Sequence, residues 1–102
     1  MSSKTSQPKS RIKVGTYVGT GAATQAITGI GFLADCVIIG DQGVVADSWI
    51  KMSSMSANAK DLSTGNYTTN AIVSIDADGF TVALVNSLCT SGVTYFYLAM
   101  KN

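Results

Sequence analysis

The stretch from Asp76 to Met100 decides the fold: it reads DADGFTVALV, then the polar spacer NSLCTSG, then VTYFYLAM. The pair Asp78-Gly79 predicts a turn, because glycine takes positive φ at no steric cost and aspartate tolerates it. In the strand that follows, side chains alternate, so Phe80, Val82 and Leu84 share one face. The run 93–100 carries no charge, so we expect its two faces to be covered by the fold itself or by a neighbouring chain.

The remainder of the chain continues this pattern of short strands between turn residues. Further strands are predicted at residues 12–18, 24–30, 33–39, 44–52 and 71–75. The segment 53–70 consists mainly of small and polar residues. A single helical turn near 57–62 is conceivable there, but it would be too short to be stable by itself. About seven strands with turns every 8–12 residues predict an all-β fold, a small antiparallel β-sandwich or barrel.

Positive charge is concentrated at the start of the chain. Lys4, Lys9, Arg11 and Lys13 carry four of the seven positive charges, and no acid precedes Asp35. We therefore divide the chain into a flexible basic N-terminal arm, residues 1–11, and one β-sandwich domain, residues 12–102. Such an arm can contact an acidic patch on a protein partner; without interleaved aromatic residues it is only a weak signal for nucleic acid.

Charged residues make up only 13% of the chain, against a usual value of about 25%. A small domain has a large surface, so scarce charge predicts that part of this surface meets other protein, as in an oligomer or an assembly subunit. A monomer solvated by Ser, Thr and Asn is the alternative. No secretory signal and no stretch of about 20 apolar residues is present, so no membrane association is expected.

The residue types give little support for catalysis. The chain has no His and no Glu, which removes the commonest general base and the Ser-His and Cys-His arrangements. Asp76 and Asp78 resemble the start of a calcium loop, but the later Glu ligand and the flanking helices are missing, which favours a turn. Cys36 and Cys89 have no metal-ligand spacing; they are expected to be free thiols, although their pairing is left open. We expect no enzyme, no metal and no cofactor.

Aromatic residues supply the candidate contact sites. In the strand 44–52, Trp49 shares a face with two charged residues, so we place it outward, at an interface. In the last strand Phe96 is assigned to the core, which leaves Tyr95 and Tyr97 on the opposite face, either at an interface or buried. A sugar-stacking platform would use Tyr17, Trp49 or Tyr67, although no spacing requires it.

Several short blocks together resemble a family of small virion domains of tailed phages, which occur alone or inside tail-fibre and head proteins. The blocks are residues 13–17, 19–21, 27–32, 35–39, 49–51, 76–82 and 91–99, together with Ile72. The resemblance implies a β-sandwich similar to the H-type lectin architecture, displayed as a trimer. The chain departs from the family at Ala83, where Gly is frequent, and at Cys89, where Asn is frequent; Cys89 argues against a polar role for its loop.

The resemblance implies a virion structural protein, made in the host cytoplasm. Because the domain has a basic arm and no long fibre attached, we expect a capsid decoration or cement protein that forms a homotrimer and docks on the major capsid protein of the same phage. The docking residues would be Lys4, Lys9, Arg11 and Lys13, and the oligomer interface would use Trp49, Tyr95 and Tyr97. The alternative is a head- or tail-fibre module that recognises host surface glycans, and head and tail locations both remain open.

Overall fold

Two antiparallel sheets face each other in the computed structural model, which describes residues 11–41, 48–55, 59–62, 64–68 and 71–102. The all-β fold class is confirmed, with nine strands in these ranges. They are β1 (Arg11–Val18), β2 (Thr24–Ile27), β3 (Cys36–Asp41), β4 (Ser48–Met52), β5 (Ala59–Asp61), β6 (Tyr67–Thr68), β7 (Ile72–Asp76), β8 (Gly79–Ala83) and β9 (Thr94–Lys101), with a 3₁₀ turn η1 (Leu84–Asn86) after β8.

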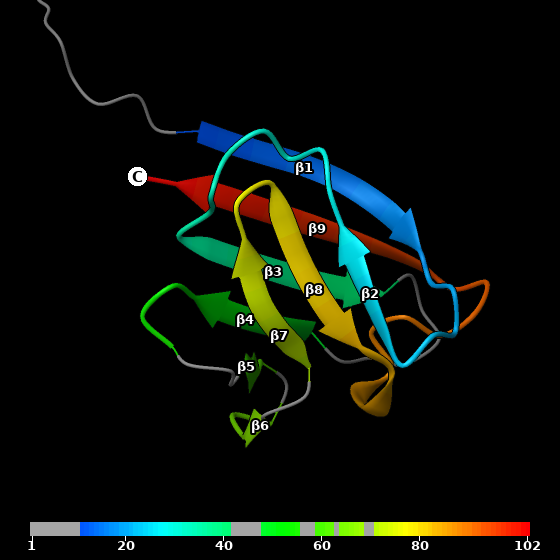
Figure 1. The fold of residues 1–102 in the computed structure, drawn as a ribbon. Coiled ribbons are helices and arrows are strands. Elements are labelled where there is room, and N and C mark those ends of the chain that lie inside the picture. The colour runs from blue at the N-terminus through cyan, green and yellow to red at the C-terminus, as the bar shows by residue number, and fades with distance from the viewer. Residues whose placement is uncertain (1–10, 42–47, 56–58, 63, 69–70) are drawn as a thin grey trace, which may run out of the picture.

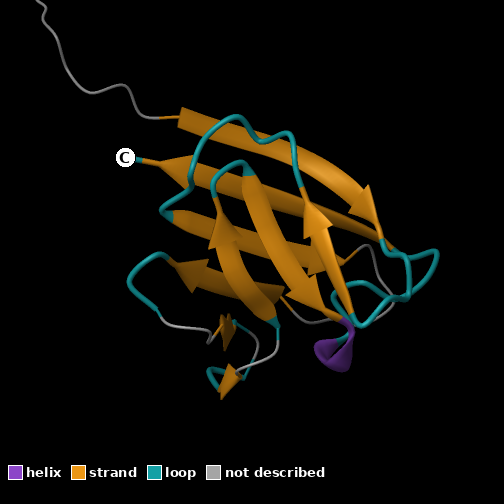
Figure 2. Cartoon of the chain, in the orientation of Figure 1, coloured by secondary structure: helices purple, strands orange, loops and turns teal. Residues whose placement is uncertain are grey.

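The larger sheet has the strand order β1-β9-β3-β4-β5-β6, and the smaller has the order β2-β8-β7. The small sheet lies across one face of the large one, as Figure 1 shows. Figure 2 shows that strands and their connecting loops make up nearly all of the described chain. The C-terminal strand β9 therefore pairs on both sides, with β1 and with β3.

The core lies between the two sheets. Phe80 and Val82 of β8 face Val37 and Ile39 of β3, and all four side chains are fully buried. Phe80 and Val82 alternate with Thr81 and Ala83 along β8, whereas Val37 and Ile39 belong to a continuous apolar run, whose inner face is decided by packing against the small sheet.

This packing decides the faces of four aromatic residues and corrects two of the predicted assignments, those of Trp49 and Phe96. Trp49 is only 4% exposed and belongs to the core, so its predicted outward position is wrong. Tyr95 and Tyr97 are also buried in the core, whereas Phe96 lies on the opposite, exposed face. Burial of Tyr95 is possible because its hydroxyl donates to the Ser87 carbonyl and accepts from the Thr90 amide, so no polar atom is stranded.

The turn before β8 is confirmed, but for a different reason from the one predicted. Asp76 and Gly79 are paired at the end of the β7–β8 hairpin. Gly79 is not among the described glycines with positive φ. Instead, a Cβ on Gly79 would overlap the carbonyl oxygen of Ile27 on the neighbouring strand β2, so the position requires glycine for close backbone approach.

Other strand limits differ from the predicted ones. The segment 53–70 contains the short strands β5 and β6, so residues 59–61 of the conceivable helical turn at 57–62 are extended chain and Leu62 is in a turn; residues 57 and 58 lie outside the described residues. Strand β2 ends at Ile27, before the predicted end at residue 30, and β3 runs from Cys36 to Asp41, later than the predicted strand 33–39 at both ends. Residues 44–47 also lie outside the described residues. No helix in the described ranges is long and apolar enough to cross a membrane.

Candidate functional site

The face of the large sheet that points away from the small sheet is apolar and uncovered by the described residues. The strand register brings every second residue of β1, β9, β3 and β4 onto this face. We call its apolar members the outer apolar patch: Ile12, Val14, Val18, Cys36, Ile38, Ile50, Met52, Phe96, Leu98 and Met100.

The patch exposes large side chains to an unusual degree. Val14 is 68% exposed, Ile12 64%, Met52 48% and Phe96 47%. On these four strands no charged residue lies on the face of the patch. The nearest charged residue along the sheet on this face is Lys60 of β5, which is paired with Ile50 of β4. Because an apolar side chain gains about 1.5–3 kcal/mol on full burial, a patch of this kind favours contact with another protein surface.

The patch also has a hollow at one corner. A cavity of about 420 Å³ is lined by Ile12, Cys36 and Met100 of the patch, together with Arg11 at the start of β1, Asp35 before β3, and Lys101 and Asn102 at the end of the chain. Elsewhere the surface is filled: the ring of Phe96 lies over Gly40 of β3, where a Cβ would come 2.7 Å from the ring edge. An apolar side chain of a partner therefore has a depression to enter beside Cys36.

The two cysteines lie in different environments and are both free thiols. Cys36 is half-buried in the outer apolar patch, whereas Cys89 is fully buried in the core and its Sγ lies 3.4 Å from the Ala22 carbonyl oxygen. Burial raises the pKa of both thiols. A raised thiol pKa reduces the fraction of reactive thiolate at neutral pH, so neither cysteine is suited to be a nucleophile.

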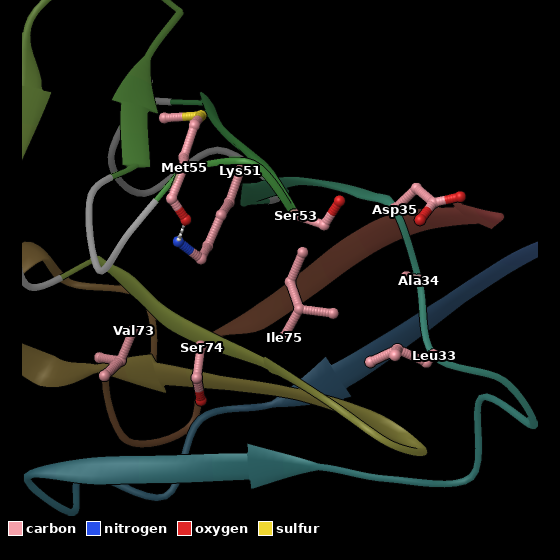
Figure 3. Close-up of a pocket in the computed structure, with 9 residues that line it drawn as sticks. All are labelled: Leu33, Ala34, Asp35, Lys51, Ser53, Met55, Val73, Ser74 and Ile75. Atoms are coloured by element: carbon pink, nitrogen blue, oxygen red, sulfur yellow. Dashed lines mark hydrogen bonds between the residues drawn. The ribbon is translucent and has the colours of Figure 1, made fainter. Parts of the chain in front are cut away.

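A second cavity, of about 550 Å³, opens between the sheets where the loop before β3, strand β4 and strand β7 meet. Figure 3 shows Lys51 reaching along this cavity to the backbone of Met55. The Lys51 ammonium donates to the Met55 carbonyl oxygen at 2.7 Å. The lysine side chain is nearly completely buried, and this burial lowers its pKa.

Asp35 and Ser74, two further polar residues around this cavity, also make hydrogen bonds within the chain. The carboxylate of Asp35 points away from Lys51 in Figure 3 and accepts the Asn102 amide at 2.8 Å. The Ser74 hydroxyl donates to Asp76 at 2.8 Å. Lys51 therefore stabilises the turn after β4. Within the described residues, no group of three or more His, Cys, Asp or Glu side chains could hold a metal ion.

Asp76 and Asp78, the two neighbouring acids, bind to different parts of the protein. Asp76 accepts the hydroxyls of Ser74 and Thr81 at 2.8 and 2.7 Å. Asp78 accepts the amides of Gly29 and Gly31 at 3.0 and 2.6 Å. Their oxygens thus stabilise the β7–β8 hairpin and the loop after β2, in agreement with the turn interpretation.

The predicted docking residues are placed only in part. Arg11 was assigned to the arm but is the first residue of β1, paired with Lys101. Lys13 is exposed on the same strand and pairs with Ala99. Lys4 and Lys9 lie outside the described residues. The structure therefore places two of the four basic residues on β1, at the positions whose side chains alternate with those of the outer apolar patch.

The predicted aromatic contact residues are mostly used inside the fold. Trp49, Tyr95 and Tyr97 fill the core of the single chain, so their side chains are not presented to a partner. Of the candidate sugar-stacking residues, Tyr17 stacks on Tyr95 with 5.0 Å between ring centres, and Trp49 is buried. Only Tyr67 is exposed, with the Lys60 ammonium 5.3 Å from its ring centre.

The outer apolar patch was missed in the sequence because β9 is apolar on both faces. Alternation alone cannot say which face of such a strand meets the core. The available signal was β1, where Ile12, Val14 and Val18 alternate with Lys13, Gly15 and Tyr17. A glycine on the same face as Tyr17 leaves room for a large side chain of the neighbouring strand, which would have allowed the interpretation that this face is inside and that the aliphatic side chains of β1 are outside.

In comparisons with known proteins, no family model, no curated protein and no solved structure matches this chain.

Proposed function

We propose that the protein is a structural component of a phage virion, a capsid decoration protein that forms a trimer through the outer apolar patch and docks on the major capsid protein. The observation that carries the self-association is this patch, which exposes aliphatic side chains and has no charged residue on its face of four adjacent strands. The virion assignment is supported by the resemblance of the sequence blocks to small phage virion domains.

A second copy of the chain fits the patch better than the chain's own N-terminal residues. Residues 2–10 are SSKTSQPKS, in which proline is the only apolar side chain, so they offer nothing to cover aliphatic groups. The same face of another copy presents matching apolar side chains and no charge to be buried without a partner. Packing of these faces around a three-fold axis would remove the exposed side chains of all three copies from water.

The basic residues suit a second contact, with the shell. Arg11 and Lys13 are exposed at the start of β1, and Lys4 and Lys9 precede them in the sequence. A positive cluster at one end of the domain complements an acidic surface, and ordering of a polar segment on contact gives a reversible clamp. In this proposal the patch holds the trimer together and the basic residues hold the trimer on the capsid.

The trimer is tested with charges placed inside the patch. We expect the protein at about 10 µM to have three times the 10.6 kDa mass of one chain by light scattering. The double variant Met52→Lys/Met100→Lys should have the mass of one chain, because six added charges would be buried in the trimer. The matched control, Thr24→Lys/Ala26→Lys, adds the same charge at exposed positions of β2 and should remain trimeric.

Docking is tested separately on viral particles stripped of the protein. Deletion of residues 2–10 should leave the mass in solution unchanged but reduce the number of copies bound per particle. Binding of the deleted form at the wild-type level would remove Lys4 and Lys9 from the proposal. A wild-type protein that is monomeric and does not bind the stripped particles would contradict the proposed function as a whole.

A further inference from the structure

Strand β1 lies at the edge of the large sheet and has a pairing partner on one side only. It pairs over its full length with β9, and in the described residues no strand pairs with its other side. Figure 1 shows β1 as the outermost strand of the sheet. The strand has eight residues, and edges of this length present a row of backbone donors and acceptors that can template pairing with another strand.

The hydrogen bonds at the end of β1 show which backbone groups face this free edge. The Gly19 amide donates to the Val93 carbonyl at 2.9 Å, toward β9. Backbone groups alternate in direction along an antiparallel strand, so the odd-numbered residues of β1 bond to β9 and the even-numbered residues point outward. The Val18 carbonyl agrees with this alternation, because it accepts a hydrogen bond at 3.0 Å from the Gln25 side chain on β2.

Three residues therefore have both backbone groups directed to the free edge: Ile12, Val14 and Thr16. Their side chains are exposed as well, and those of Ile12 and Val14 belong to the outer apolar patch. The opposite edge strand, β6, has only two residues, so it cannot match β1 in length. Among the described strands at the ends of the large sheet, the best match for β1 is β1 of another copy.

We propose that β1 pairs antiparallel with β1 of a second copy about a two-fold axis at Val14. In this register Ile12 lies opposite Thr16 of the second copy, and all three outward-facing residues exchange backbone hydrogen bonds. Lys13 then lies opposite Gly15, which has no side chain, and like charges are kept apart. The outer apolar patches of the two copies become continuous, with Val14 against Val14 at the axis.

Neighbouring registers are less favourable for identifiable reasons. An axis at Lys13 would bring two lysines directly opposite each other, which destabilises a strand pair. An axis at Gly15 would pair Ile12 with Val18, whose carbonyl is already bonded to Gln25. The axis at Val14 avoids the like-charge contact and uses only backbone groups for which the described residues supply no partner.

This contact goes beyond the proposed trimer and does not depend on it. Edge pairing acts in the plane of the sheet, whereas the trimer would form through the face of the sheet. Three paired residues per strand make a small contact, so we expect it at high protein concentration or between copies crowded on a surface. On a shell, it would link one trimer to the next.

The test uses the Met52→Lys/Met100→Lys protein, in which the face contact is removed. Between about 10 µM and about 1 mM, its mass should rise from one chain to two. Adding Thr16→Pro should keep the mass at one chain, because proline has no amide and blocks a sheet edge. The Thr16 amide faces outward, and Gly15 before it has no Cβ to clash with the ring, so the fold should persist. Thr16→Ala is the matched control and should still associate.

Amide hydrogen exchange on the same double variant gives a readout that does not depend on substitution at Thr16. The amides of Ile12, Val14 and Thr16 should exchange at least about tenfold more slowly at the high concentration, while those of Lys13 and Gly15 are protected at both. Association without protection of the even-numbered amides, or a mass of one chain at every concentration, would overturn the proposal. Neither result depends on whether the wild-type protein forms a trimer or binds viral particles. Those two measurements test the proposed function and not the edge contact.

Discussion

Tyr97 and Gly15 lie directly opposite each other on β9 and β1, and the hydroxyl end of Tyr97 occupies the space that a side chain on Gly15 would need. A Cβ on Gly15 would lie 2.6 Å from the Tyr97 oxygen. The tyrosine is buried and packs edge-on against Phe80 with 5.3 Å between ring centres, so it has little freedom to move aside. The glycine thus makes room for an aromatic side chain in the core, a cross-strand arrangement known to fix register.

This pair predicts that Gly15→Ala destabilises the protein by about 1–3 kcal/mol, the usual cost of overpacking a core. Gly40→Ala provides the comparison. It meets the Phe96 ring at a similar distance but on the exposed face, where the ring can turn into solvent, so its cost should be under about 1 kcal/mol. Urea unfolding of the three proteins measures the difference. Equal costs for the two substitutions would show that Tyr97 is free to move.

A second prediction concerns Asp78, which holds the loop after β2 through the amides of Gly29 and Gly31. Both glycines have positive φ, which glycine adopts without steric cost, and the two hydrogen bonds to Asp78 fix this one conformation among those open to them. Asp78→Ala should cost about 1–2 kcal/mol and increase amide exchange at Gly29 and Gly31. The adjacent substitution Ala77→Ser, at an exposed turn position, should leave both measurements unchanged.

The third prediction is a pH dependence at Tyr17. Burial raises the pKa of Tyr17 far above its ordinary value of 10.0, with smaller contributions from Tyr95 and Cys89. Above about pH 10 the unfolded chain therefore loses the Tyr17 proton while the folded chain keeps it. Since the folded state then binds more protons, the free energy of unfolding falls as pH rises.

Tyr17→Phe removes this dependence. At pH 7 the variant should be about 1–2 kcal/mol less stable, because the Tyr17 hydroxyl donates to the Leu88 carbonyl at 2.7 Å and that acceptor is left without its donor. Between pH 10 and pH 11 the difference from the wild type should shrink. Burial lowers the pKa of Lys51, which acts in the opposite direction in both proteins and so cancels in the comparison. A constant difference across the pH range would contradict the prediction.

The fourth prediction uses the two cysteines as reporters of the outer apolar patch. A maleimide reagent should label half-buried Cys36 and leave fully buried Cys89 unlabelled until the protein unfolds. In the proposed trimer Cys36 is covered, so its labelling should slow by at least about fivefold as the concentration rises through the association range. The Met52→Lys/Met100→Lys protein should lose this concentration dependence. Equal labelling of Cys36 at all concentrations of a trimeric protein would place the trimer contact elsewhere.

Much of the fold follows from the sequence because its strands are short and clearly bounded. The predicted strands 12–18 and 93–100 agree with β1 and β9 to within one residue at each end, since alternation and the Ser91-Gly92 turn mark their limits. The short strands β5 and β6 were not predicted: Ala59–Asp61 and Tyr67–Thr68 show no alternation long enough to detect, and they are extended because they continue the sheet from β4. Tertiary pairing decided their structure.

By itself, the sequence determined the all-β class, most strand positions and the turn between Asp76 and Gly79, because alternation and turn residues are local properties of the chain. Only the tertiary structure decided which side of β9 is inside. Tyr95 and Phe96 are neighbours of similar size and apolar character, and the choice between them depends on remote groups, namely the carbonyl of Ser87 and the empty space at Gly15 and Gly40. The same choice turned Trp49 inward and left Ile12 and Val14 exposed, which created the outer apolar patch on which the proposed contacts depend.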